Sequence, residues 1–213
     1  MKSSEIAAII GAIVILTAVI GISFPFTVTI QGLLQALMYS AIIILVYVFS
    51  KKIFAFMVDS DVEHEFWKVS RYGPQSGAYL RNPAPAGIIV PLFFTVLSLG
   101  FFKIMPLLTY ETRALSVRAS KRFGYYSYTE MSEWHNGLIG AVGIISVLIV
   151  SLISYILLPA NDVLWRMAIY FAFWNMIPVS NLDGTQIFFG SRTLWSTLAI
   201  IVAISTAYAL LLI

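Results

Sequence analysis

Long apolar segments are the feature of this sequence that most limits what it can fold into. A helix needs about 20 mostly apolar residues to cross the hydrocarbon core of a bilayer. The apolar segments cover about residues 5–23, 31–50, 86–106, 137–158, 163–178 and 194–213. The chain of 213 residues is 60% hydrophobic and 11% charged, whereas a soluble domain is about 25% charged. The sequence therefore predicts an all-α, multi-pass integral membrane protein with about six transmembrane helices in a single domain, residues 1–213.

Two polar regions separate these segments. The first, residues 51–85, begins with "KKIFAFMVDSDVEHEFWKVSRYG", into which the second helix can continue. The second, residues 107–136, is rich in basic residues and tyrosines, which suits either a headgroup interface or an ordinary solvated loop. The segment 163–178 is short for a spanning helix and ends at Pro178. We therefore expect a helix that breaks inside the protein, where surrounding protein can satisfy the freed backbone groups.

The residue inventory excludes several kinds of chemistry. The chain has no cysteine, so disulfides, thiolate metal ligands and a cysteine nucleophile are absent. Its net charge of +3 is small and scattered, so no nucleic-acid partner is expected, and membrane lipid is the expected surrounding. Only two histidines are present, His64 and His135, so a metal site would depend largely on carboxylates.

The most specific pattern in the chain is N-x-x-P-x-x-x-L-D-G. Its residues are Asn175, Pro178, Leu182, Asp183 and Gly184. Read by itself, the pattern predicts a helix that ends at a proline and an Asp-Gly turn that follows it. An ionisable residue such as Asp183 at a membrane segment is costly, and this cost indicates a partner or a function.

The pattern resembles the second signature of the site-2 protease family of intramembrane zinc metalloproteases. "WHNGLIGAVGIISVLIVSLI" is similar to the glycine-rich helix that precedes this signature, and "KVSRYG" to the segment after the family's first metal motif. The glycines at 137, 140 and 143 would allow close helix packing. The resemblance implies a site-2-protease-like core over about residues 45–192. It also implies that Asp183 is a zinc ligand and that Asn175 and Pro178 shape a groove for a substrate or partner.

The first metal motif of that family, H-E-x-x-H, is incomplete here. A zinc site of this type takes two His at i and i+4 on a helix and a Glu as general base. In one register His64 is a ligand and Glu65 the base, but Lys68 replaces the second His. In a second register Asp61 and Glu65 replace both His residues and Val62 replaces the base. That all-oxygen set suits Mg²⁺, Ca²⁺ or Mn²⁺ better than zinc.

Each register lacks part of what the chemistry needs. The resemblance therefore implies a protease-like fold without protease activity, a pseudoprotease with no cofactor that binds or scaffolds another membrane protein or a transmembrane segment. We expect an ion pair between Lys68 and Asp183 to replace the metal. Two alternatives remain open: an active zinc protease with an unusual ligand set, and a small transporter or channel subunit in which Asp183 and Lys68 line a polar path.

Overall fold

The computed structural model describes residues 2–22, 29–71, 79–115, 131–158 and 162–211. Their elements follow one another as α1 (Ser3–Gly21), α2 (Ile30–Met57), β1 (Ser60–Phe66), β2 (Val69–Arg71), β3 (Tyr79–Ala84), α3 (Ala86–Leu97), β4 (Leu108–Ala114), α5 (Glu133–Leu157), α6 (Asp162–Met176), α7 (Asp183–Gly190) and α8 (Arg192–Leu211). Much of the polar region 107–136 lies outside the described residues.

Four of the described helices, α1, α2, α5 and α8, are long and apolar enough to cross a membrane. The expectation of a mainly helical membrane protein is thereby confirmed, but six spans are not. Helix α3 has 12 residues and ends before Leu99 and Gly100, which have positive φ angles of 55° and 82°. Helix α6 has 15 residues, a length of about 22 Å, which is less than the roughly 30 Å of the hydrocarbon core.

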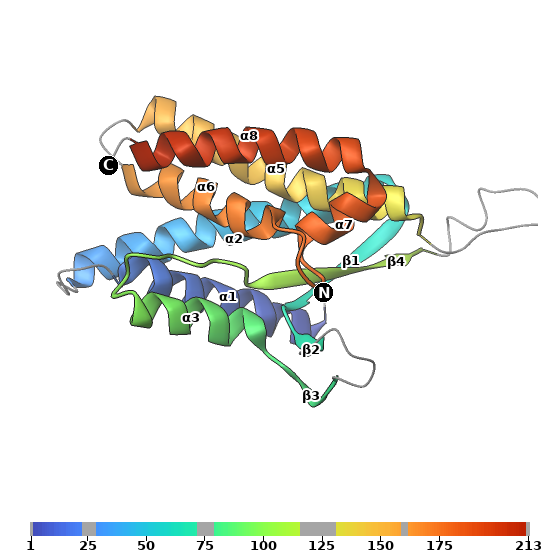
Figure 1. Cartoon of the computed structure of the whole chain (residues 1–213), viewed down its shortest axis with the longest axis horizontal. Helices are drawn as coiled ribbons and strands as arrows, with labels where there is room; N and C mark the ends of the chain where they lie inside the picture. The colour runs from blue at the N-terminus through green and yellow to red at the C-terminus, as the bar shows by residue number, and fades with distance from the viewer. Residues whose placement is uncertain (1, 23–28, 72–78, 116–130, 159–161, 212–213) are drawn as a thin grey trace, which may run out of the picture.

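The helices lie alongside one another, and the strands lie toward the end of the bundle where α7 is found (Figure 1). Helix α5 packs against α2, α6 and α7, and α1 packs against α2 and α3. The glycines of α5 allow these close contacts. A Cβ atom at Gly137 would lie 3.1 Å from the carbonyl oxygen of Gln186 in α7. The prediction that these glycines serve helix packing is therefore confirmed.

The predicted continuation of the second helix holds only as far as Met57. Asp59 has a positive φ of 52°, and the chain then enters β1. Strand β1 pairs antiparallel with β4, with His64 opposite Tyr110, and β2 pairs antiparallel with β3. The fold is therefore not purely helical. Ser60, Val62 and His64 are buried on one face of β1, whereas Asp61 and Glu65 are exposed on the other.

Candidate functional site

The candidate site is built around Asp183, the first residue of α7. The expected break is present, because α6 ends at Met176 and α7 begins at Asp183. Gly184 is needed here because a Cβ atom at this position would lie 2.1 Å from the carbonyl oxygen of Met176. The Asp-Gly turn thus brings α7 back against the end of α6. As a result of this turn, the Asp183 side chain has no exposed surface.

Two side chains of α2 contact the Asp183 carboxylate. The Lys51 ammonium lies 2.7 Å from Asp183 Oδ2, and both side chains are fully buried. The Tyr47 hydroxyl donates a hydrogen bond of 2.9 Å to the same oxygen. Tyr47 and Lys51 are four residues apart, so they lie on one face of the helix. The burial of the Asp183 carboxyl raises its pKa above the usual value, while Lys51 and Tyr47 oppose that rise.

Two aromatic rings complete the surroundings of the Lys51 ammonium. Lys51 Nζ lies 3.8 Å from the ring centre of Tyr47 and 4.1 Å from that of Tyr110 in β4. A cation over the face of an aromatic ring is attracted by the negative potential of that face. We call Tyr47, Tyr110 and Asp183 the Lys51 cage.

The glycine-rich helix α5 makes room for this cage. A Cβ atom at Gly143 would lie 2.3 Å from Lys51 Cε, and one at Gly140 would lie 2.7 Å from the Tyr110 hydroxyl. Any side chain at these positions would therefore displace Lys51 or Tyr110. Helix α2 and strand β4, which are far apart in the sequence, can therefore approach α5 closely because these positions are glycines.

The predicted ion pair between Lys68 and Asp183 is wrong. Lys68 is 52% exposed and pairs with Glu65 at 2.6 Å, three residues away. The true partner, Lys51, stands at the end of the apolar segment 31–50 and looks from the sequence like a flanking charge. Since α2 extends to Met57, Lys51 lies inside a candidate membrane span. The sequence signal that could have identified Lys51 is the presence of an ionisable residue within a membrane span.

The structure does not assemble either predicted set of metal ligands. In the first register the two ligand positions needed a helix, but His64 lies on a strand. In the second, Asp61 and Glu65 point to the exposed face of β1, away from the fully buried Asp183. Among the described residues no group of three His, Asp or Glu side chains could bind a metal ion. The Asp183 carboxylate contacts an ammonium and a tyrosine hydroxyl rather than the two histidines of an H-E-x-x-H zinc site, and a protonated ammonium cannot ligate a metal.

His64 belongs instead to a second buried polar cluster next to the cage. Its backbone N–H donates to Glu5 Oε1 at 3.2 Å, and its Nδ1 lies 3.2 Å from the same oxygen. Lys52 Nζ lies 2.8 Å from that oxygen and donates to the carbonyl of Val62. Burial lowers the pKa of His64 to about 4, so the ring is neutral at pH 7. Its ring centre lies 6.2 Å from that of Tyr47.

Asn175 and Pro178, the two residues predicted to shape a partner groove, differ in their exposure. Asn175 is fully buried, and its side-chain amide donates a 2.8 Å hydrogen bond to the carbonyl of Phe171 within α6. Pro178 is exposed in the turn that follows. The two residues therefore have different surroundings, and their role in binding a partner stays a prediction.

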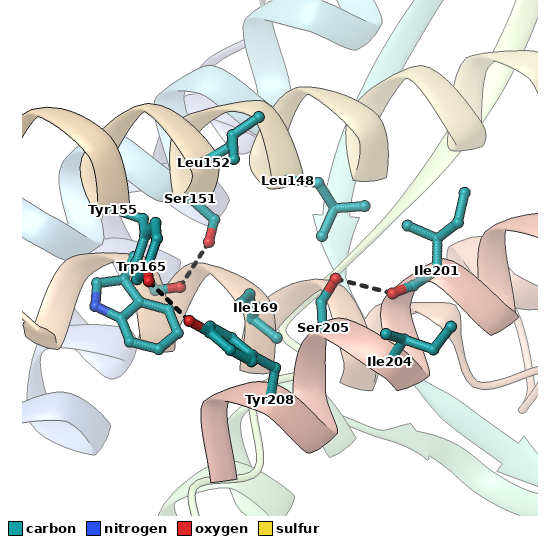
Figure 2. Close-up of a pocket in the computed structure, with 10 residues that line it drawn as sticks. All are labelled: Leu148, Ser151, Leu152, Tyr155, Trp165, Ile169, Ile201, Ile204, Ser205 and Tyr208. Carbon is teal, nitrogen blue, oxygen red and sulfur yellow. Dashed lines mark hydrogen bonds between the residues drawn. The ribbon is translucent and has the colours of Figure 1, made fainter. Parts of the chain in front are cut away.

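A cleft of about 430 Å³ lies on another face of the bundle, between α5, α6 and α8 (Figure 2). Its polar groups bond to one another or to the backbone. Ser151 donates to the carbonyl of Trp165, Ser205 to that of Ile201, and the hydroxyls of Tyr155 and Tyr208 lie 2.7 Å apart. The other lining residues are Leu148, Leu152, Ile169 and Ile204. The cleft is therefore an apolar surface with no charged group among these residues.

Comparisons of the chain with protein-family models, with curated proteins and with solved structures found no match. The long apolar helices define the chain as a membrane protein, and its candidate site is a buried ion pair enclosed by tyrosines.

Proposed function

We propose that the chain is a non-catalytic, multi-pass membrane protein with a site-2-protease-like core, and that it binds or scaffolds another membrane protein or a transmembrane segment. The observation that carries this proposal is the layout of Tyr47, Lys51 and Asp183. Two side chains at i and i+4 on one helix and a carboxylate from another helix have the arrangement that an H-E-x-x-H zinc site requires.

The identity of these side chains argues against catalysis. Hydrolysis at such a site needs a metal-bound water and a general base. Here an ammonium is paired with the carboxylate, and Val48, the residue directly after Tyr47, carries no base. The Lys51–Asp183 pair links α2 to α7, the connection that a metal ion would make in an active relative. A link between these two helices that an ammonium forms in place of a metal ion supports a binding role rather than catalysis.

The metal content of the purified protein tests the non-catalytic part of this proposal. We expect less than stoichiometric zinc in both the wild type and the Asp183→Ala variant, measured by elemental analysis in detergent. Stoichiometric zinc in the wild type that is lost in Asp183→Ala would overturn the proposal and favour a protease. Cleavage of a single-span substrate in proteoliposomes, lost in the same variant, would do so as well.

Photo-crosslinking in native membranes tests the binding part. A photoreactive phenylalanine analogue at Val179, in the exposed turn after Pro178, probes the predicted partner surface. The same photoreactive analogue placed at Ile204 probes the apolar cleft. A discrete protein adduct at either position supports a binding role. Lipid adducts alone at both positions would contradict it.

A further inference from the structure

The Lys51 cage has the composition of a cation-binding site. It surrounds the ammonium with one carboxylate oxygen at 2.7 Å and two ring faces with centres at 3.8 and 4.1 Å. Aromatic faces together with a carboxylate are the groups with which proteins recognise ammonium ligands. A divalent cation such as Ca²⁺ or Mg²⁺ would need six or more oxygen ligands, which this cage does not supply.

The cage residues are positioned by contacts that do not involve Lys51. The Tyr110 hydroxyl donates a 2.7 Å hydrogen bond to the carbonyl of Asn136, and its ring is held in strand β4 opposite His64. Tyr47 donates to Asp183, and its ring packs edge-on against Phe171. The site should therefore keep its shape when the lysine side chain is shortened.

The Asp183 carboxylate can also accept a further hydrogen bond. Among the described residues, no hydrogen-bond partner faces its buried Oδ1 atom. A primary ammonium has three N–H groups, whereas the tether of Lys51 restricts how its own three can be aimed. A free alkylammonium would not be restricted in this way.

We propose that Tyr47, Tyr110 and Asp183 form a binding site for a primary alkylammonium cation, which the chain fills from within by Lys51. Lys51 is then a tethered ligand rather than only one half of a salt bridge. Its removal leaves a site that a free ammonium of matching length can occupy. This inference concerns the cage itself and does not depend on which partner the protein binds.

Chemical rescue of Lys51→Ala tests the proposal. The probe is n-propylammonium chloride, because three carbons and one nitrogen are the atoms that the substitution removes. We expect a saturable rise in the melting temperature of Lys51→Ala in detergent, roughly 3–6 °C at ten times the dissociation constant. Wild type, in which the site is filled, should show no such rise.

Matched controls separate cation binding from solvent effects. Lys51→Ala with Asp183→Asn keeps the cavity but removes the charge that recognises the cation, so it should not respond. Neutral 1-propanol and sodium chloride at equal concentration should not replace the amine. An equal rise in the double variant, an equal rise with 1-propanol, or no rise at all in Lys51→Ala would overturn the proposal.

A refolding measurement covers the case in which Lys51→Ala is recovered only as aggregate. The variant is then refolded into detergent with and without n-propylammonium, and the monodisperse fraction is measured by size-exclusion chromatography. A fraction that requires the amine supports the site. A fraction that is equally low or equally high in both conditions contradicts it.

Discussion

The Lys51 ammonium and the Asp183 carboxylate lie 2.7 Å apart, and neither side chain has any surface exposed to solvent. Lys51 belongs to the candidate span α2, and Asp183 begins the short helix α7 after the break that follows α6. A buried pair of this kind is not in itself strong evidence of stability, because both charges lose their hydration. The loss of one partner, however, leaves an uncompensated buried charge.

Asp183→Ala should therefore lower the free energy of unfolding by about 3–5 kcal/mol. Adding Lys51→Met removes the orphaned ammonium and should recover part of that loss. Unfolding is followed by tryptophan fluorescence in a detergent titration. Lys68→Met provides the matched control, since Lys68 is exposed and pairs with Glu65, an interaction of about 0–1 kcal/mol. Rescue of Asp183→Ala by Lys68→Met and not by Lys51→Met would contradict the assigned pair.

The sequence identified Asp183 but could not identify its partner. An aspartate that follows an apolar segment and a proline can be recognised in the sequence from the residue types alone. The choice between Lys51 and Lys68 depends on where α2 ends, and the segment "AFMVDSDV" contains no Gly or Pro to mark that end. The helix ends at Met57, and the turn uses Asp59 in the left-handed region.

The strands were missed for a similar reason. "SDVEHEF" has charged residues at helical as well as alternating spacing, so i,i+4 pairs on a helix end fit it equally well. The alternation of buried and exposed residues along β1 arises because β1 pairs with β4, a strand that is distant in the sequence. His64 therefore lies on a strand, one element after the helix that carries Tyr47 and Lys51.

The two tyrosines of the cage should differ in what their hydroxyls contribute. Tyr47→Phe removes a hydrogen bond to a charged carboxylate and should cost about 1.5–3 kcal/mol of unfolding free energy. Tyr110→Phe removes a hydrogen bond to the neutral carbonyl of Asn136 and should cost about 0.5–1.5 kcal/mol. Both variants keep the ring next to Lys51. A larger cost for Tyr110→Phe than for Tyr47→Phe, measured in the same titration, would contradict the assigned bonds.

Gly143→Ala should destabilise the protein by about 1–3 kcal/mol, because the added Cβ would lie 2.3 Å from Lys51 Cε and force the lysine from its position. Gly21→Ala is the control. Its Cβ would meet only the end of the Leu33 side chain at 3.2 Å, and its effect should stay within about 0.5 kcal/mol. Combining Gly143→Ala with Lys51→Ala should remove the clash. Additive losses in that double variant would show that Gly143 acts independently of Lys51.

The stability of the protein should fall as the pH is lowered from 6.5 towards 4. The folded-state pKa of His64 is about 4, below the ordinary 6.5, because burial opposes its charged form. Glu5 faces the ring from α1, and Lys51 and Lys52 act on it from α2. Between these two pH values the unfolded chain binds the proton and the folded chain does not. His64 should therefore account for a loss of about 2 kcal/mol in the free energy of unfolding between pH 7 and pH 5.

Melting temperatures of His64→Gln should show a weaker pH dependence over this range than those of the wild type. His135→Gln, which changes the other histidine of the chain, should keep the wild-type dependence. An unchanged dependence in His64→Gln would contradict the assignment.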